Sequence, residues 1–559
     1  GNMILVSDVS GTAIVSKIGV TGSITGSVQF QRYLDAKRVY RYMGTPVYST
    51  RVVDWQATMQ IGGPFTGGTG AASLYYYDGG NGGWISYPGE GGSNTATFDM
   101  GRGYSLFQYN GTTPNKLQIT GPLQQGNFDY ANLSVGSGDA QADDGWNLLS
   151  NVYAAPIQWG TTGWVLNDII ETVSVRNNIN SVDGGFKTWN RLTNIGDSDF
   201  GGVISQGQAF WVKTSGFTPS IRITEDAKVN VANPVFYREA PTPNQLTITL
   251  KNSAFVDRTF LHFADDSFDG VEGKFDALKR DNTYFNLSTK VDNTDLTINS
   301  MTLNFCEKSI PLNLRTIKPG HYSFEFSKLE TFDFEVEAKL IDHFNNTTVV
   351  LTEGSQYEFD VTTLAASAGL NRFELVLAKP AIDPSIQFAE ASQQACESTN
   401  GVSVTLANTQ RGVVYSFYSN GNEVGSLQGM GGSMDAIINS SQLTYGANTL
   451  EMKAKFTGCE STVLSSLTAL NYKQTFKPVV NPISVCEGES ASVQAGGAPA
   501  SAVYQWFERE SDSSPVFTSE NGIFSTPTLI KSKNYFVSTL YNGCTSDKNE
   551  VTVQVDHLD

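Results

Sequence analysis

The stretch GWNLLSNVYAAPIQW, residues 145–159, contains two tryptophans and no charged residue, in a chain that has only eight tryptophans among 559 residues. An earlier stretch, YRYMGTPVYSTRVVDW, residues 40–55, has the same pattern of aromatic and apolar positions. Tyr42 matches Trp146 and Trp55 matches Trp159, both at an offset of 104. The two stretches therefore indicate an internal duplication, the sequence signature of a repeated structural unit.

The match between the two copies extends downstream at a nearly fixed offset. The further pairs are Gly103 with Gly207, Ile119-Thr120 with Ile223-Thr224 and, one residue out of step, Trp84 with Trp189. The recurring positions are mostly aromatic or glycine, which is what a shared packing scheme requires. Trp146 and Trp159 are therefore predicted to be core or half-buried anchors rather than a ligand platform.

An aromatic loop region lies inside the first copy, in the stretch SLYYYDGGNGGWISYPGE, residues 73–90. Aromatic rings beside Asp and Asn are typical of proteins that stack and hydrogen-bond sugars. The candidate glycan-binding residues are Tyr75, Tyr77, Trp84 and Tyr87. The alternative is a strand with alternating tyrosines followed by a glycine-rich turn.

The middle of the chain alternates between apolar and polar residues, as in LTITL, YSFEFSKL and NRFELVLA. Short strands of this kind, separated by turn residues, predict an antiparallel β-sandwich. One loop in this region, DDSFDGVEGKFD, residues 265–276, has the spacing of a twelve-residue calcium loop. The candidate calcium ligands are Asp265, Ser267, Asp269, the backbone carbonyl of Val271, and Asp276. An acidic surface loop without metal is the alternative, because position 12 is Asp rather than a bidentate Glu.

Four of the five cysteines fall into two similar segments in the last third of the chain. Cys396 and Cys459 are 63 positions apart in the sequence, and Cys486 and Cys544 are 58 apart. An aromatic strand lies between the cysteines of each pair, so each segment is predicted to be an immunoglobulin-like (Ig-like) sandwich with its own disulfide. Such bonds form in an oxidising compartment. The fifth cysteine, Cys306, is predicted to be a small buried apolar residue.

The bulk composition limits the partners of the chain. A net charge of −18 makes nucleic acid and anionic membranes unfavourable partners, because phosphate binding needs clustered Lys and Arg. No apolar run approaches the roughly 20 residues that span a bilayer. The first twenty residues, interrupted by Asp8 and Lys17, do not form a signal peptide, so an exported protein would carry its signal upstream. Abundant Gly, Ser, Thr and Asn are typical of extracellular β-rich proteins.

The predicted fold class is all-β and multidomain, with duplicated β-rich N-terminal units, a β-sandwich and two C-terminal Ig-like sandwiches. The expected segments are lead-in strands (1–38), repeat unit 1 (39–126), repeat unit 2 (127–236), the antiparallel sandwich (237–380), Ig-like module 1 (381–473) and Ig-like module 2 (474–559).

Several phrases also resemble the C-terminal regions of large surface proteins that Bacteroidetes export by type IX secretion. The phrases are GWNLLSNVYAAPIQW, QGQAFWVKTSG, RITEDAKVN with FYRE, DGVEGKFDALK and QFQRYLDAKRVYRYMGTPV, and the resemblance covers residues 28–559. The cysteine modules resemble the Ig-like or PKD-like domains of the same proteins. The resemblance implies a secreted or cell-surface location and no catalytic residues. The terminal sorting domain that such proteins carry does not follow VTVQVDHLD.

The expected function is a non-catalytic segment of a secreted or cell-surface protein, for adhesion, presentation or spacing of an upstream region. The alternative is a carbohydrate-binding accessory region of a polysaccharide-degrading system. No enzyme is expected, because the histidines are scattered singly and no metalloprotease, nucleophile-elbow or Walker motif occurs. The expected partner is a surface glycan or another surface protein. Calcium, at the loop described above, is the one cofactor that the sequence suggests, and a monomer is expected.

Overall fold

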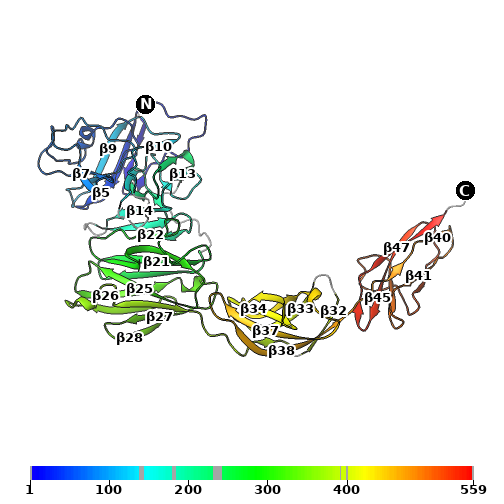
Figure 1. Ribbon diagram of the computed structural model, residues 1–559. Coiled ribbons are helices and arrows are strands. Elements are labelled where there is room, and N and C mark those ends of the chain that lie inside the picture. The colour runs from blue at the N-terminus through cyan, green and yellow to red at the C-terminus, as the bar shows by residue number, and fades with distance from the viewer. Residues whose placement is uncertain are drawn as a thin grey trace. The chain divides into compact units, whose positions relative to one another are not determined.

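The computed structural model describes residues 3–136, 144–178, 184–230, 242–390, 392–397 and 401–556 (Figure 1). The chain divides into two compact units, Gly1–Ala378 and Lys379–Asp559. Strands make up nearly all of the regular secondary structure, and α1 (Val52–Gln56) is the only α-helix in the described ranges. The all-β prediction is confirmed. The phrase FYRE, residues 236–239, lies outside the described residues.

The first unit begins with the two copies of the duplicated sequence. Three strands precede the first copy: β1 (Met3–Leu5), β2 (Ser7–Asp8) and β3 (Gly11–Thr12). The strands of the first copy are β4 (Val28–Leu34), β5 (Tyr40–Met43), β6 (Leu74–Asp78), β7 (Gly83–Ser86), β8 (Tyr104–Phe107) and β9 (Asn115–Gly121). Those of the second are β10 (Phe128–Tyr130), β11 (Trp146–Ser150), β12 (Ile157–Gln158), β13 (Trp164–Asn167), β14 (Thr172–Asn177), β15 (Gly185–Asn190), β16 (Ile195–Gly196), β17 (Val203–Ile204), β18 (Ala209–Lys213) and β19 (Ser220–Ile223), followed by a 3₁₀ turn, η1 (Glu225–Ala227).

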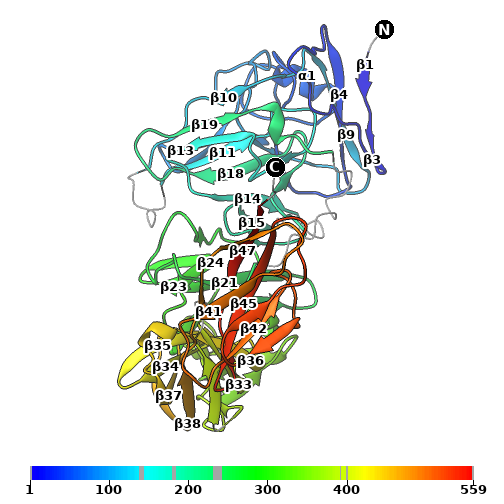
Figure 2. The same ribbon diagram turned by 90° about the vertical axis from the view of Figure 1, so that its right-hand side faces the viewer.

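The two copies have the same strand order, which confirms the duplication. The first copy forms the sheet β5-β8-β6-β7, and the second forms β11-β18-β14-β15-β16. A second pairing is also shared: β4 pairs with β9, and β10 pairs with β19, which continues to β13 (Figure 2). β5 and β11, which begin the matching sequences, therefore occupy equivalent places in the two copies, and so do β9 and β19, near their ends.

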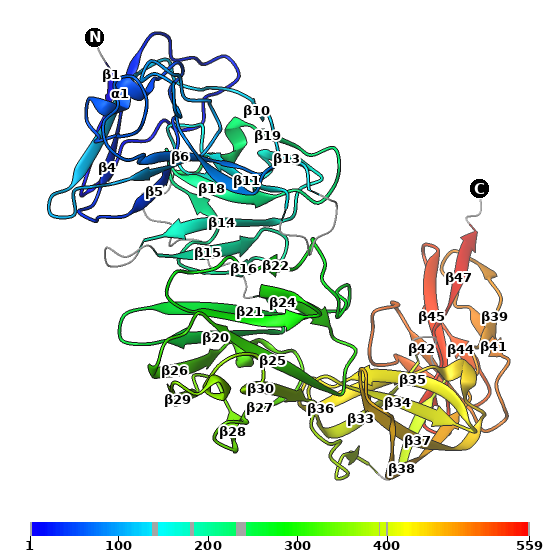
Figure 3. The ribbon, with the colours of Figure 1, turned by 60° about the vertical axis from the view of Figure 1, so that its left-hand side comes forward.

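The second part of the first unit is a large sheet that curls on itself. Its order is β28-β27-β30-β25-β23-β24-β21-β20-β26-β29, with β22 added beside β24. The bounds are β20 (Gln245–Lys251), β21 (Val256–Ala264), β22 (Ala277–Leu278), β23 (Asn286–Val291), β24 (Thr294–Thr302), β25 (Glu307–Arg315), β26 (Gly320–Ser327), β27 (Glu337–Asp342), β28 (Thr347–Leu351), β29 (Gln356–Val361) and β30 (Phe373–Ala378), with 3₁₀ turns η2 (Leu329–Thr331) and η3 (Ala365–Ser367). Figure 3 shows β20, β21 and β24 below β14, β15 and β16.

The curled sheet forms a sandwich because strands far apart in its order face each other. Phe324 of β26 and Phe359 of β29 pack against Phe373 of β30, with ring centroids 4.9 and 4.7 Å apart. All neighbouring strands in this sheet are antiparallel except β21 and β24, which run parallel. Alternation along strands such as β20 places every second side chain in this core.

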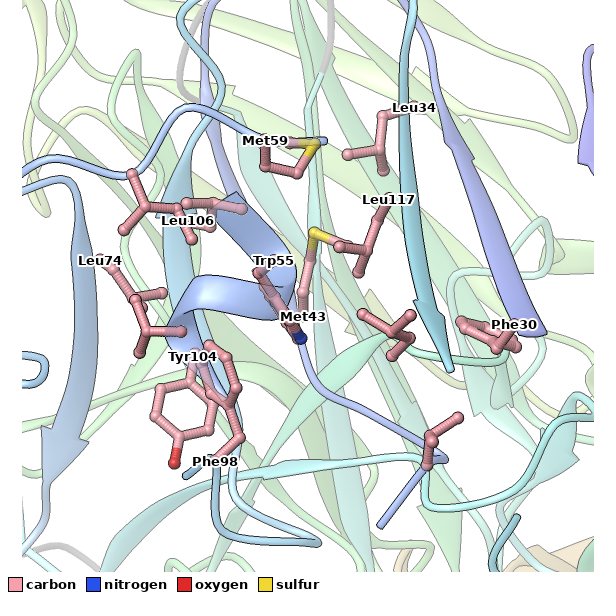
Figure 4. Close-up of a cluster of buried hydrophobic side chains, with 14 of the residues drawn as sticks. Phe30, Leu34, Met43, Trp55, Met59, Leu74, Phe98, Tyr104, Leu106 and Leu117 are labelled. Atoms are coloured by element: carbon pink, nitrogen blue, oxygen red, sulfur yellow. The ribbon is translucent and has the colours of Figure 1, made fainter. Parts of the chain in front are cut away.

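Each copy of the duplication has its own apolar core. Trp55, fully buried, lies at the centre of the first core and stacks on Phe98 with 4.2 Å between ring centroids (Figure 4). Trp159, 1% exposed, packs against Trp164 in the second core. Trp146 is 6% exposed and lies in a separate cluster between the sheets of the two copies. The prediction that Trp146 and Trp159 are packing residues is confirmed.

The second unit consists of two modules with one plan. Module 1 contains β31 (Gln387–Phe388), β32 (Ser392–Cys396), β33 (Val402–Thr409), β34 (Val413–Ser419), β35 (Asn422–Gln428), β36 (Gly432–Ile438), η4 (Ser440–Gln442), β37 (Gly446–Phe456) and β38 (Thr462–Lys473). Module 2 contains β39 (Val479–Val480), β40 (Ile483–Cys486), β41 (Ser492–Gly496), β42 (Val503–Phe507), β43 (Phe517–Ser519), β44 (Ile523–Ser525), β45 (Lys533–Tyr541), β46 (Cys544–Thr545) and β47 (Asn549–Asp556). The sheets β31-β33-β36 and β32-β38-β37-β34-β35 of module 1 correspond to β39-β41-β44 and β40-β47-β45-β42-β43 of module 2.

The predicted pairing of the cysteines within each module is wrong. Cys396 is bonded to Cys544 of the other module, with 5.4 Å between the two Cα atoms, and Cys486 is free and exposed. The reason is the register of the strands. Cys486 lies beside Asp556, near the Lys533 end of β45, whereas Cys544 follows the other end of that nine-residue strand. The two are separated by roughly 25–30 Å of strand, and a disulfide requires less than about 7 Å between Cα atoms.

The same geometry separates the cysteines of module 1. Cys396 pairs in register with Lys473 at the end of β38, while Cys459 precedes the start of that twelve-residue strand. Cys459 is nevertheless disulfide-bonded, and so is Cys306. Cys306 is exposed, so the prediction that it is a small buried residue is also wrong.

None of the described helices is long and apolar enough to cross a membrane.

Candidate functional site

The sheet β5-β8-β6-β7 has two faces that differ in burial. Leu74, Tyr104 and Leu106 point into the core of the first copy. The alternate positions point the other way and carry six aromatic side chains and two serines, Ser86 and Ser105. This second face, called the aromatic face below, consists of Tyr40, Tyr42, Tyr75, Tyr77, Trp84 and Phe107.

Strand register sets the spacing of the rings on the aromatic face. Tyr40 lies opposite Phe107 and Tyr77 lies opposite Trp84. The ring centroids of Tyr40 and Phe107 are 4.9 Å apart, and those of Tyr77 and Trp84 are 5.6 Å apart. Tyr75 joins the two ends, with its ring 6.2 Å from that of Tyr40 and its hydroxyl donating to the carbonyl of Ala72 at 2.8 Å.

One end of the aromatic face packs against the second copy. Trp211 of β18 lies edge-on to Tyr77 at 4.7 Å and to Trp84 at 5.9 Å. Figure 3 shows β5 and β6 beside β11 and β18, where this contact is made. Close approach of the backbones requires glycine: a Cβ on Gly103 would lie 2.7 Å from that of Ala209. This end of the face therefore also holds the two copies together.

The aromatic face is nevertheless partly open, both at Trp84 and at the end away from Trp211. The side chain of Trp84 is 42% exposed, and Tyr40, Tyr75 and Phe107 are half-buried. The guanidinium of the exposed Arg38 lies 5.6 Å from the ring centroid of Phe107. Partly exposed rings with guanidinium groups beside them offer an apolar surface with hydrogen-bond donors at its edge. Such a surface stacks on flat, partly apolar molecules that carry hydroxyl groups.

Arg176 flanks the aromatic face on the side of the second copy. Its guanidinium lies 5.1 Å from the ring centroid of Tyr42 and 5.8 Å from that of Phe186. Beneath it, the guanidinium of Arg280 lies 3.9 Å from the ring centroid of Trp211. These cations hold the rings of the junction in place through their attraction to the ring faces.

The structure brings three of the four predicted glycan residues together. Tyr75, Tyr77 and Trp84 share the aromatic face. Tyr87 does not: its ring packs on the core side of the sheet, 5.2 Å from Tyr104 and 5.7 Å from Phe98, and its hydroxyl donates to the carbonyl of Thr97. The sequence reasoning missed Tyr40, Tyr42 and Phe107. The alternation in YRYM and YSLF was the available signal, once both were assigned as strands.

The predicted calcium loop does not gather its carboxylates around one point. Asp265 is exposed, and Asp269 is paired with Lys308. Asp276 is 3% exposed, and its two carboxylate oxygens accept the backbone N–H groups of Ser300 and Glu272 at 2.7 and 2.9 Å. Within the described ranges, no three side chains of His, Cys, Asp or Glu come together in a way that would hold a metal ion.

The remaining two predicted ligands also fail to converge. Ser267 is buried, and its hydroxyl has no hydrogen-bond partner among the described residues. Val271 is half-buried. The loop instead joins the second copy to the sandwich. The hydroxyl of Thr172 donates to the carbonyl of Asp276 at 3.1 Å, and the amide of Asn190 donates to the carbonyl of Phe275 at 3.1 Å.

Asp276 should make the stability of this junction depend on pH. Burial raises the pKa of Asp276 to about 7, although the two backbone N–H groups lower it. A carboxyl with a raised pKa contributes stability that is complete below its unfolded value, near pH 4, and is lost as the pH rises through 7. Asp276→Asn removes this titration. The stability advantage of the original chain over the variant should therefore be largest near pH 4.5 and shrink by a few degrees of melting temperature above pH 7.

The measurement for Asp276 is thermal unfolding of both chains at pH 4.5, 6.0 and 8.0. The matched control is Asp266→Asn, since this carboxylate is on the same loop but is 68% exposed in its ion pair with Lys274. The control should show no such trend. A difference between the Asp276 variant and the original chain that is constant with pH would contradict the account.

Comparison with sequence families gives two matches. Residues 10–377 match the family described as "Domain of unknown function (DUF8693)", and residues 476–556 match "Ig-like domain CHU_C associated". The second match confirms an Ig-like domain at the C-terminal end of the chain. No curated protein matches the chain in sequence.

Several solved structures have local similarity to the chain. The fibronectin(III)-like modules of Clostridium thermocellum CbhA are 14% identical, with 31% of this chain and 94% of that chain covered and a TM-score of 0.18. Murine CEACAM1b is 14% identical, with 31% and 100% covered and a TM-score of 0.16. The ICAM-5 D1–D4 fragment is 9% identical, with 74% and 95% covered and a TM-score of 0.21. At these TM-scores none of the three tells what this chain binds.

The first match spans about two thirds of the sequence, including both copies of the duplication, the aromatic face and the sandwich. The chain is therefore a member of the DUF8693 family that also carries an Ig-like domain associated with CHU_C.

Proposed function

We propose that this chain is a non-catalytic segment of a secreted or cell-surface protein, and that it attaches to a polysaccharide through the aromatic face. The observation that carries the proposal is the group of six rings on one face of β5-β8-β6-β7, with Trp84 exposed and the guanidinium of Arg38 beside the ring of Phe107. A pyranose ring presents apolar C–H faces and equatorial hydroxyls, which match exposed aromatic rings with donors at their edge. The net charge of −18 favours an uncharged polymer at this surface.

The proposed location rests on the cysteines and on the domain types. Four of the five cysteines are disulfide-bonded, and structural disulfides persist outside the cytosol. The Ig-like domain is of a kind that serves as a building block rather than as an enzyme. Export by type IX secretion, presentation of an upstream region and attachment to a polysaccharide-degrading system remain parts of the proposal. Their support is the resemblance of the sequence phrases given above.

Binding to insoluble cellulose, chitin and xylan tests the function. The original chain is expected to bind at least one of the three in a saturable manner. Trp84→Ala and Tyr75→Ala should each weaken binding about two- to tenfold, the change expected when one aromatic contact of about 0.5–1.5 kcal/mol is lost. The measurement is a depletion isotherm at several protein concentrations.

The matched control for this test is Phe217→Ala. Phe217 is an exposed aromatic residue of the second copy that does not belong to the aromatic face. Its loss should leave binding unchanged. If the original chain binds none of the polymers, or if the control loses as much affinity as the two variants, attachment through the aromatic face is rejected.

A second candidate function, spacing, is favoured by the bond between Cys396 and Cys544. This bond ties the two modules together, and the segment between them is held on both sides. The backbone N–H of Thr475 donates to the Glu397 carboxylate at 3.0 Å, and the amide of Asn549 donates to the carbonyl of Pro478 at 3.0 Å. A linker fixed in this way supports a spacer that resists bending at the joint.

The double variant Cys396→Ser/Cys544→Ser should release that joint. The bond closes a sequence separation of 148 residues, for which the chain-entropy model gives a stabilisation of about 5 kcal/mol. This value is the upper limit for the stability that the joint loses when the bond is removed. Hydrogen exchange of the peptide containing Thr475 should become faster. Cys486→Ser removes a thiol that forms no disulfide and is the control, with no change expected. Equal exchange in all three chains would contradict a fixed joint.

A further inference from the structure

The two Ig-like modules repeat the placement of their first cysteine as well as their strand order. Cys396 is the last residue of β32, and Cys486 is the last residue of β40. Each of these strands runs parallel to the final strand of its module. Cys396 pairs in register with Lys473, and Cys486 pairs with Asp556. Cys486 is therefore the structural equivalent of Cys396.

The residues that follow these cysteines are also equivalent. Glu397 comes after Cys396, and its backbone N–H donates to the carbonyl of Lys473 at 2.8 Å. Glu487 comes after Cys486, and its backbone N–H donates to the carbonyl of Asp556 at 3.2 Å. The equivalence thus extends from the strand into the turn beyond it.

The second cysteine of each module directly follows a glycine of a hairpin turn. Gly458 precedes Cys459 and Gly543 precedes Cys544, with φ angles of +82° and +83°. Glycine adopts this left-handed conformation without steric cost, so each cysteine follows the same kind of turn. Both of these cysteines are disulfide-bonded.

The bond between the modules joins the first kind of cysteine to the second kind. Cys396 of module 1 is bonded to Cys544 in the Gly-Cys turn of the module that follows it. The joint is reinforced by the ammonium of Lys473, which donates to the carbonyl of Asn542 at 2.8 Å, and by Phe476, whose ring lies 5.3 Å from that of Tyr541. At the one joint between Ig-like modules in the described residues, the first cysteine of one module is therefore bonded to the Gly-Cys turn of the next.

Cys486 has the position of a bonded cysteine but is unbonded and exposed. An exposed apolar residue, Ile530, lies close by and is 66% exposed. It follows Leu529, whose backbone carbonyl accepts the backbone N–H of Gly488 at 2.8 Å. We propose that Cys486 is the attachment point for a further Ig-like module of the same plan, which bonds to it through its own Gly-Cys turn. This proposal does not rest on carbohydrate binding.

The bond would form by thiol–disulfide exchange with a small disulfide such as oxidised glutathione. The Cys486 thiolate attacks one sulfur of that disulfide and releases one glutathione thiolate. The thiolate of the incoming Gly-Cys turn then attacks Cys486 Sγ in the mixed disulfide and releases the second. Two protein thiols lose their protons and become one disulfide, and one glutathione disulfide is reduced to two thiols.

The test appends a second copy of residues 474–556 directly after residue 556 of this chain. The new linker then follows Asp556, the last residue of β47, in the same way as residues 474–478 follow Lys473, the last residue of β38. The appended copy carries Cys486→Ser and Asp547→Glu, so that its peptides differ in mass from the originals. The chain is oxidised with a glutathione redox buffer, alkylated and digested without reduction, and the linked peptides are identified by mass spectrometry.

The expected result is a peptide that links the original Cys486 to the marked Gly-Cys turn of the appended copy, in most of the material. When the appended copy also carries Cys544→Ser, Cys486 should be alkylated instead. The original bond between Cys396 and Cys544 reports correct folding in both chains. If that bond forms while Cys486 stays alkylated, or is found in a dimer of two chains, the proposal is overturned.

Discussion

Replacing Arg372 with methionine is expected to destabilise the β-sandwich by about 3–5 kcal/mol. Arg372 and Asp342 are both fully buried, and the guanidinium donates to the two carboxylate oxygens at 3.2 and 3.0 Å. It also donates to the carbonyl of Asp360 at 2.8 Å. Methionine fills similar volume but leaves the carboxylate buried without a countercharge. Truncating one partner of such a pair costs more than the pair itself contributes.

The electrostatics of Asp342 support this expectation. Burial alone would raise the pKa of Asp342, but hydrogen bonds from Arg372 and Tyr357 bring it below its ordinary value. The carboxylate is therefore charged in the folded chain at neutral pH. The second substitution Asp342→Asn, added to Arg372→Met, removes the stranded charge and should recover part of the lost stability.

Urea unfolding, followed by hydrogen exchange of peptides from β27 and β30, measures the effect. The control is Arg222→Met, which breaks an ion pair with Asp129 whose side chains are 52% and 65% exposed. Exposed pairs contribute about 0–1 kcal/mol, so the control should unfold almost as the original chain does. A loss of less than about 1 kcal/mol on Arg372→Met would contradict the role given to the pair.

Trp55→Ala and Trp159→Ala should each cost about 3–5 kcal/mol, because both side chains fill the core of one copy of the duplication. Replacement by phenylalanine should have different costs at the two positions. The indole N–H of Trp55 has no hydrogen-bond partner among the described residues. That of Trp159 donates to the carbonyl of Glu171 at 2.8 Å. Trp159→Phe should therefore cost about 0.5–1.5 kcal/mol more than Trp55→Phe.

The extra cost of Trp159→Phe is smaller than the penalty for a buried carbonyl without any donor. The Glu171 carbonyl keeps a second donor, the backbone N–H of Arg191 at 3.1 Å. Local opening free energies from hydrogen exchange of peptides in each core provide the measurement. Equal costs for the two phenylalanine variants would show that the cores are equivalent in chemistry as well as in topology. The alanine variants are the reference for full loss of the side chain.

The features that sequence could predict are those with local causes. The fixed offset between the two copies predicted the duplication and the burial of Trp146 and Trp159, since packing schemes recur with their aromatic residues. Alternation in the sandwich predicted its strands for the same kind of reason. In both cases the deciding pattern is read directly from the order of residue types and does not depend on which distant strands pair.

The failures depend on contacts between distant segments. The carboxylate of Asp269 pairs with Lys308, and that of Asp276 accepts the N–H of Ser300, so the loop spacing alone could not show that they point apart. The cysteines failed because the spacing within each module is also compatible with a bond to the next one. The bond between Cys396 and Cys544 follows only from the register of the strands.

The aromatic face was predicted only in part, because it depends both on a local cluster of rings and on the pairing of distant strands. The stretch around Tyr75 and Tyr77 showed a cluster of rings, but the sequence did not show which rings share a face. Tyr40 and Phe107 join them only because β5 and β6 both pair with β8. Tyr87 lies beyond the end of β7 and turns to the core side, where it packs on Tyr104.

Hydroxyl-radical footprinting with and without a soluble oligosaccharide of the polymer that is bound tests attachment through the aromatic face most directly. Oxidation of Trp84 and Tyr75 should fall when the ligand is present, because stacked sugars exclude water from their exposed surfaces. Oxidation of Phe217, which is exposed elsewhere, should stay unchanged. Ligand binding that leaves the oxidation of Trp84 and Tyr75 unchanged, or that protects another surface instead, would contradict the proposed site.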